Sequence, residues 1–391
     1  MPQPLSLLRR ILIIIVLAGV GGNAVAFEPV EASMLVAEPG EMVYQCTGHA
    51  AIRLQCPAYG LDNVFSFETD YSGGLAGQIL GQAKGKFQRI TFEEYCSGFA
   101  AEGRGITEFP LNLTDGQIRH LWMLCDNDAE SGSERRFNIR WQSCNSEAVD
   151  KICAALADEN IMVRSDSVSE MDNGEWGSYF CAEHSPWSTM IIIIGLGTGA
   201  QQTDSWRTRM FPVSMAYMLP KAIIRSTDGT ERPLLTRVPT EILPSRRLDG
   251  APWFTPVVFF ALVLAVSIVI SAADLSGRWP RMVAVADRVA LLLQSAVSLA
   301  LIAVAVMPLS IGGAWNWLYL PLNPLPALVW LFCRHRRWVP GFFAAYGAVC
   351  VLFIAAPLFT SNAGMWSSLL AAAIAVRVLT HYLPIISKQH K

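Results

Sequence analysis

Cys144 has the local setting that a thiol nucleophile requires. Apolar residues recur at helical spacing after it, at Ala148 and Ile152. We therefore expect Cys144 in the first turn of a helix, with Ser143 as the N-cap. Unpaired N–H groups and the helix dipole at that position favour an anion, which lowers the pKa of a thiol and provides a donor for a developing oxyanion. The alternative is that Cys144 is one more disulfide partner.

His49 is the base that we expect beside this thiol. It opens a predicted β-strand, and an imidazole at a strand end next to a cysteine at a helix start can form a thiolate–imidazolium pair. Other histidines are less suitable, since His120 falls in the middle of a predicted helix and His184 in a polar stretch. The alternative is an ordinary packed or surface histidine.

Strands and helices are mixed around these two residues, which predicts an α+β domain. Residues 50–54 and 64–68 are predicted as two strands joined by a turn at 56–60, and 137–141 as a further short strand. The apolar residues 190–194 are too few to cross a bilayer and are predicted as a buried strand or a helix at the membrane interface.

The chain begins with an export signal. Two arginines precede an apolar run at 11–20, and Ala24-Val25-Ala26 offers a cleavage site of small residues. We therefore assign residues 1–26 to a signal peptide, with an uncleaved anchor helix as the alternative. In either case residues 27–250 form an extracytoplasmic domain.

Residues 251–391 are predicted to form a membrane domain. Five apolar runs each have about the 20 residues that a helix needs to cross hydrocarbon: 254–273, 286–307, 314–333, 341–360 and 364–384. The loops after the first and third runs and the C-terminus carry lysine and arginine, whereas the two remaining loops carry none. The positive-inside rule then predicts a multi-pass protein of the bacterial inner membrane, with its catalytic domain in the periplasm.

Composition excludes some functions. The net charge of -2 gives no basic field for nucleic acid, and 52% hydrophobic residues are too many for an ordinary soluble enzyme. Seven of the nine cysteines fall between residues 27 and 250, in a compartment that favours disulfides. If Cys144 is reserved for chemistry, six remain for up to three bridges.

Two short motifs are compatible with ligand sites. Cys46, His49 and Cys56 could bind zinc, but an oxidising compartment favours disulfides over thiolate ligands. Residues 195–199, Gly-Leu-Gly-Thr-Gly, contain only part of a dinucleotide-binding fingerprint. We therefore expect neither a metal nor a cofactor.

Short motifs along residues 43–220 resemble the Lnb-type family, membrane-bound lipoprotein N-acyltransferases that move an acyl chain within the lipoprotein itself. The motifs lie at 48–54, 62–67, 111–114, 137 with 143–144, 195–197, 204 and 210–212. The resemblance implies a circularly permuted papain-like, NlpC-type fold with histidine ahead of cysteine. It also implies that an all-α region follows, here with five predicted transmembrane helices.

Carried over residue by residue, the resemblance makes Cys144 the nucleophile and His49 the base. The family's asparagine on the returning strand corresponds to Ser66, so Ser66 is the expected partner of the imidazole and Glu68 the alternative. Ser143 stands where the family has asparagine, and residues 145–147 also depart from the family's pattern.

We therefore expect a membrane-bound cysteine acyltransferase that moves an acyl chain from a lipid or lipoprotein ester to an amine through an acyl-thioester on Cys144. Its expected partner is a lipid or lipoprotein substrate in the membrane. One alternative is a cysteine peptidase or amidase that acts on cell-wall peptide, although tethering such an enzyme needs no five-span anchor. The other is a non-catalytic envelope assembly module.

Overall fold

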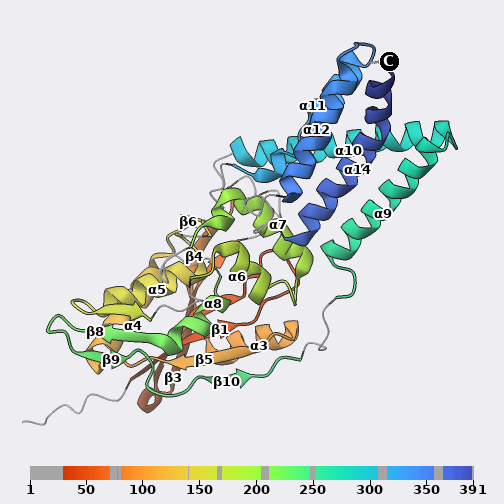
Figure 1. The fold of residues 1–391 in the computed structure, drawn as a ribbon. Coiled ribbons are helices and arrows are strands. Elements are labelled where there is room, and N and C mark those ends of the chain that lie inside the picture. Colours follow the sequence, from red (N-terminus) through yellow and green to blue (C-terminus); the bar gives the residue numbers. More distant parts are fainter. Residues whose placement is uncertain are drawn as a thin grey trace, which may run out of the picture.

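The computed structural model describes residues 30–70, 77, 81–139, 141–164, 170–203, 211–246, 252–306, 315–355 and 364–389. The predicted signal peptide and positions 204 and 210 of the family motifs lie outside the described residues. The rest forms an N-terminal part of strands and helices and a helical C-terminal part (Figure 1). The predicted α+β class is confirmed for the N-terminal part. The permuted papain-like arrangement stays a prediction.

The N-terminal part is built on an antiparallel seven-stranded sheet with the strand order β10-β5-β1-β2-β3-β4-β6. Its strands are β1 (Glu31–Ala37), β2 (His49–Cys56), β3 (Leu61–Thr69), β4 (Lys84–Thr91), β5 (Ile106–Pro110), β6 (Arg135–Arg136) and β10 (Thr240–Leu243). A smaller sheet contains β7 (Asn160–Val163), β8 (Ala222–Arg225) and β9 (Glu231–Pro233). The predicted hairpin that begins with His49 is therefore the centre of the larger sheet.

Helices cover both faces of this sheet. They are α3 (Phe92–Glu102), α4 (Asp115–Ser131), α5 (Cys144–Ala155), α6 (Asn173–Phe180), α7 (Pro186–Leu196) and α8 (Val213–Met218). Ile52 and Phe65 are buried on the face that packs against α4 and α5, whereas Ala51 and Val64 are buried on the opposite face against α3. This alternation is the two-residue period of a strand buried on both sides.

One local prediction is wrong, and another is decided between its two alternatives. Residues 137–141 were predicted as a strand, but Asn138 and Gln142 close a tight turn there. Residues 190–194 lie within helix α7, so the strand alternative is excluded. Met190 and Ile194 of this helix pack against the C-terminal helices, and this tertiary contact cannot be read from local propensity.

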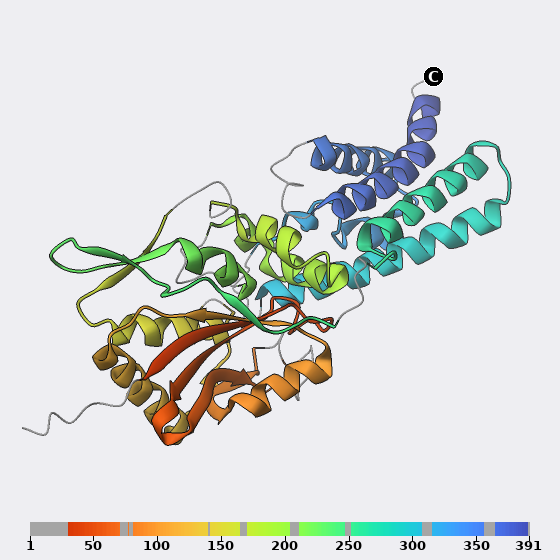
Figure 2. The ribbon, with the colours of Figure 1, turned by 90° about the horizontal axis from the view of Figure 1, so that it is seen from below.

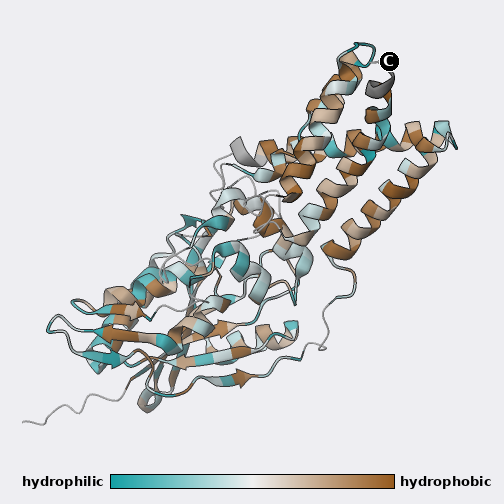
Figure 3. Cartoon of the chain, viewed as in Figure 1, coloured by the Kyte–Doolittle hydropathy of each residue, from teal (hydrophilic) through white to brown (hydrophobic). Residues whose placement is uncertain are grey.

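The C-terminal part consists of apolar helices, drawn mostly in brown in Figure 3. They are α9 (Pro256–Leu275), α10 (Pro280–Val306), the 3-10 helix η4 (Trp317–Tyr319), α11 (Leu325–Cys333), α12 (Val339–Ala355) and α14 (Met365–Gln389). Among the described residues, three helices are long and apolar enough to cross a membrane: α9, α10 and α14. The crossing by all five predicted segments stays a prediction.

One of the five predicted spans is interrupted. Residues 314–333 were predicted as one continuous helix, but η4 and the nine-residue α11 are separate elements. Pro321 and Pro324 lie between them, and a proline ring removes a backbone donor and clashes with the preceding helical turn. The interruption leaves η4 beside the N-terminal part, where it contacts the end of α7.

No disulfide joins any of the nine cysteines, all of which lie in the described residues. The predicted bridges are therefore absent from this structure. The sheet separates most of the thiols, since Cys56 and Cys125 lie in the core on the α4–α5 face, while Cys96 packs against the core on the α3 face. Cys46 and Cys181 belong to a third cluster, beside α6 and α7.

Candidate active site

The β2–β3 hairpin sets His49 opposite a carboxylate. Cys56 pairs with Leu61 and Ile52 with Phe65, and continuing this register to the strand ends places His49 opposite Glu68. Directly opposed residues in an antiparallel pair have Cβ atoms about 5 Å apart, close enough for their side chains to interact. The His49 Nε2–Glu68 Oε1 distance is 3.2 Å.

Gly48 makes this position of the histidine possible. Its φ is +86°, which L residues with a side chain rarely adopt. A Cβ added there would also lie 2.7 Å from the Ala37 carbonyl oxygen and 2.8 Å from Val213 Cγ1. The chain therefore turns sharply against β1 just before His49 begins β2.

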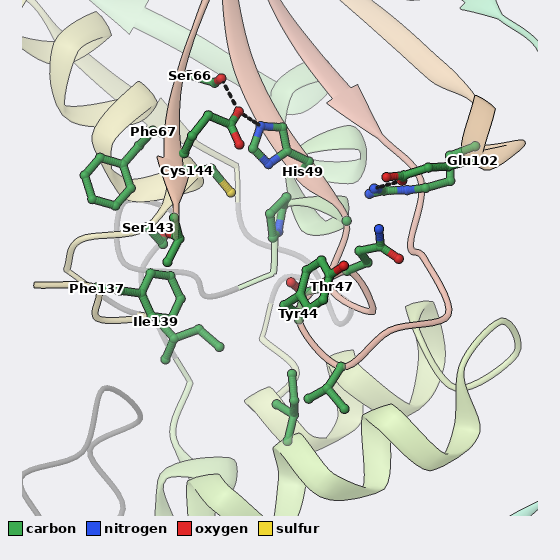
Figure 4. Close-up of a pocket in the computed structure, with 18 of the residues that line it drawn as sticks. Tyr44, Thr47, His49, Ser66, Phe67, Glu102, Phe137, Ile139, Ser143 and Cys144 are labelled. Atoms are coloured by element: carbon green, nitrogen blue, oxygen red, sulfur yellow. Dashed lines mark hydrogen bonds and ion pairs between the residues drawn. The ribbon is translucent and has the colours of Figure 1, made fainter. Parts of the chain in front are cut away.

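Ser66 lies one step further from the imidazole. Its hydroxyl donates to Glu68 Oε1, the same oxygen that faces His49 (Figure 4). Ser66 was the expected direct partner of His49 and Glu68 the alternative, and the structure places Glu68 in that position. The hairpin register explains this, because the residue opposite His49 is Glu68, two positions beyond Ser66.

Cys144 is the first residue of α5, and Ser143 caps the helix as expected. The Ser143 hydroxyl accepts from the Ser146 N–H, and the Ser146 side chain accepts from the Ser143 N–H. The Cys144 side chain interacts with His49 closely enough to raise the pKa of the imidazole. Figure 4 shows the sulfur beside the imidazole, on the side away from the Glu68 contact. Nδ1 is therefore the ring nitrogen available to the sulfur.

Electrostatics favours a charged imidazole between Cys144 and Glu68. Burial alone would lower the pKa of His49, but its interactions with Cys144 and Glu68 outweigh burial and raise the pKa well above its usual range. Burial would raise the pKa of Glu68, yet His49 and the Ser66 hydroxyl bring that pKa below its ordinary value. The Glu68 side chain is 42% exposed, and it lines the cavity described below.

An aromatic wall from α3 covers the other side of His49. The rings of Tyr95 and Phe99 lie 6.3 and 5.9 Å from the imidazole, centroid to centroid. Arg104 packs over Phe99 and donates to Glu102 and to the Glu38 carbonyl oxygen. The wall restricts the access of water to the imidazole, and burial holds the pKa of the Tyr95 hydroxyl well above its usual range.

His49, Glu68 and Cys144 line a cavity of about 680 Å³. This volume is within the usual size range of small-molecule sites, about 300–1,000 Å³. Its polar lining near the sulfur includes His49, Ser66 and Glu68. Apolar side chains from the 137–139 turn, from α7 and from α10 complete the wall: Phe137, Ile139, Ile191, Ile192, Ile194 and Leu301. The cavity therefore extends from the sheet to the C-terminal helices.

The alternative ligand sites find no support in the geometry. No group of three or more His, Cys, Asp and Glu side chains suitable for a metal occurs among the described residues. Cys46 and Cys56 lie in different core clusters, so they do not join His49 in a zinc site. Residues 195–199 end α7 and begin a 3-10 helix, whereas a dinucleotide loop would follow a strand.

The sequence did not indicate the wall of the cavity. Tyr95 and Phe99 are four residues apart on α3, so their place beside each other is readable as a helical spacing. Which strand residue they cover is set by tertiary packing. The contribution of Leu301 was also missed, since nothing in an apolar run distinguishes the residue that faces a cavity.

In comparisons with protein-family models, with curated proteins and with solved structures, no match to this chain was found.

Proposed function

We propose that the protein is a membrane-bound cysteine acyltransferase with Cys144 as the nucleophile, His49 as the base and Glu68 as the residue that orients His49. The observation that carries this proposal is a cysteine–histidine–carboxylate series that opens into a largely apolar cavity between the sheet and the membrane-type helices. Such a nucleophile performs acyl transfer, and such a cavity suits an acyl chain.

Formation of the acyl-enzyme is the first half of the reaction. Cys144 Sγ attacks the carbonyl carbon of an ester, and a C–S bond forms as the carbonyl oxygen becomes an oxyanion. The backbone N–H of Cys144, at the first position of α5, is suited to donate to that oxygen. The C–O bond then breaks, and the leaving alcohol takes the proton that His49 holds.

Transfer to an amine completes the reaction. The amine nitrogen attacks the thioester carbon while His49 accepts the proton that the amine releases. A C–N bond forms, the C–S bond breaks, and Cys144 returns to its starting state. Glu68 keeps the imidazole oriented and favours its charged form throughout, without itself accepting the proton.

The setting of the reaction is part of the proposal. We place the N-terminal part in the periplasm, at the outer face of the bacterial inner membrane, following the export signal and the basic loops. The acyl donor is a lipid or lipoprotein ester, and the acceptor is an amine such as a lipoprotein N-terminus. The resemblance to the Lnb-type family supports this choice of substrates.

A transfer assay tests the proposal. Purified full-length protein is incubated with a long-chain lipid ester and a peptide amine, and the N-acyl peptide is measured by mass spectrometry. We expect product with the wild-type protein and none with Cys144→Ser, whereas Cys153→Ser, on the same helix, retains activity as the matched thiol control. Release of free fatty acid or cleavage of the peptide, without N-acyl product, would favour the hydrolase alternative.

A further inference from the structure

The apolar end of the catalytic cavity is lined by two helices, one from each part of the molecule. Helix α7 contributes three isoleucines, at positions 191, 192 and 194, and helix α10 contributes Leu301. We call this boundary the α7–α10 seam. Figure 2 shows the long helix α10 reaching from the C-terminal part towards the helices of the N-terminal part. A membrane-type helix thus supplies part of the wall of the active-site cavity.

Helix α7 belongs to both hydrophobic cores. Ile192, Ile193 and Leu196 are buried in the cluster beside α6 and Trp176, within the N-terminal part. Met190 and Ile194 pack against the core of the C-terminal helices. Because opposite faces of α7 pack into different cores, this helix joins the two parts of the molecule.

Hydrogen bonds hold both ends of α7. The Ser188 hydroxyl donates to the Glu41 carbonyl oxygen at 2.8 Å, which ties α7 to the loop that leads into His49. At the other end, the Thr198 N–H donates to the Trp315 carbonyl oxygen at 2.8 Å, and Asn316 Nδ2 donates to the Ile194 carbonyl oxygen at 2.8 Å. The last two hydrogen bonds therefore hold the two parts of the molecule together beside the seam.

Close packing also holds the two parts of the molecule together at this boundary. A Cβ at Gly197 would lie 2.2 Å from the Trp315 carbonyl oxygen, so only glycine permits this approach. The Tyr319 hydroxyl donates to the Leu301 carbonyl oxygen at 3.0 Å and holds α10 beside η4. Leu301 itself is 9% exposed, whereas Leu299 on the same helix is 59% exposed.

We propose that the apolar end of the cavity holds the acyl chain of the donor and that Leu301, which closes this end beside α7, limits the length of the chain. This inference rests on the proposed acyltransfer at Cys144 and names the residue that sets its chain-length specificity. The isoleucines of α7 and Leu301 surround the chain with apolar side chains, which favours its burial. Burying each methylene along the wall favours binding by about fourfold, and a longer chain is favoured until it meets Leu301.

The chain-length preference of Cys144 loading tests the inference. Full-length protein is mixed with palmitoyl phospholipid vesicles or with a water-soluble butyryl ester, and the acyl adduct on Cys144 is followed by mass spectrometry. In Leu301→Trp the indole shortens the apolar end of the cavity, so we expect the ratio of palmitoyl to butyryl loading to fall by about tenfold. Leu299→Trp, at the exposed position on the same helix, keeps the wild-type ratio.

Leu301→Ala provides the opposite change. Removing the wall lengthens the chain that fits, so the preference shifts towards acyl groups longer than palmitoyl. An unchanged ratio in Leu301→Trp or an unchanged preference in folded Leu301→Ala would overturn the inference. Wild-type protein that accepts the butyryl group but never the palmitoyl group would overturn it too, while the proposed function stands. Protein that accepts neither group would refute the proposed function itself.

Discussion

At the scale of single residues, the proposed acyl transfer depends on the charge of His49. The imidazole lies between the Cys144 side chain and Glu68, and both raise its pKa. Glu68 reaches it because the hairpin register sets the two residues opposite each other, and Ser66 holds the Glu68 oxygen that makes the contact. The residue that orients the base is thus itself held by a neighbour two positions away on the same strand.

Glu68→Gln tests this arrangement through pH. Removing the carboxylate lowers the pKa of His49, so the imidazolium loses its proton at a lower pH than in the wild type. Iodoacetate is an anion that the imidazolium attracts, and its rate of reaction with Cys144 falls as that charge is lost. We expect the alkaline limb of the rate profile to move to lower pH. Glu94→Gln, at an exposed carboxylate that also lines the cavity, serves as the control. An unmoved limb in Glu68→Gln would contradict the account.

Ser66→Ala should have a smaller effect of the same kind. The hydroxyl helps to lower the pKa of Glu68 but does not touch the imidazole. Loss of one such hydrogen bond is expected to reduce acyl transfer by about tenfold at most, less than the loss caused by Glu68→Gln. The kcat values of the two variants are compared. A larger loss in Ser66→Ala than in Glu68→Gln would indicate that Ser66, and not Glu68, is the functional partner of His49.

The identity of the third residue was contained in the sequence. Once the turn is placed at residues 57–60, Cys56 pairs with Leu61. Counting seven residues away from the turn along each strand then pairs His49 with Glu68. Ser66 was preferred because it occupies the position of the family's asparagine. The pairing register is the stronger physical argument, since it follows from the turn alone.

At the scale of elements, three C-terminal helices are joined by a charged cluster. Arg377 on α14 pairs with Asp287 on α10 at 2.6 Å and with Asp274 on α9 at 2.8 Å, and His381 contacts Asp274 at 2.7 Å. The Arg377 side chain is only 12% exposed. A buried fork on two carboxylates fixes how the three helices are oriented relative to one another.

Arg377→Met should destabilise the protein strongly. The change leaves Asp274 and Asp287 without their guanidinium partner, and breaking a buried pair in this way costs about 3–5 kcal/mol. Thermal unfolding in detergent measures the effect as a lowered Tm. Arg278→Met, at an exposed arginine in the loop after α9, should change stability by less than about 0.5 kcal/mol. Equal shifts in the two variants would show that the cluster contributes little.

At the scale of the whole molecule, the active-site cavity lies between the sheet and the apolar helices, and α7 is part of both. Local patterns in the sequence predicted that Cys144 starts a helix, that His49 starts a strand of the hairpin, and that Ser143 caps α5. They did not predict which part of the C-terminal region approaches the sheet. That approach depends on Gly197 and Asn316, whose partners lie far away in sequence.

Topology can be tested at the interrupted segment. The basic stretch 334–337 follows α11, and the positive-inside rule places it in the cytoplasm. In a variant whose native cysteines are replaced by serine, His335→Cys should react with a membrane-impermeant maleimide only after the cells are opened. A cysteine introduced at Asp115, at the start of α4, should react in cells whose outer membrane is made permeable. Labelling of position 335 from outside would contradict the predicted topology.

The most direct test of the central claim is the mass of Cys144 itself. Wild-type protein incubated with a long-chain lipid ester and no amine should accumulate an acyl group on the peptide that contains Cys144. Hydroxylamine should remove this group, because it is a thioester. His49→Ala should lower the rate of its formation by about a hundredfold or more, the usual contribution of a positioned base. A Cys144 that alkylates readily but never acquires an acyl group, or an adduct that forms equally fast in His49→Ala, would contradict the account.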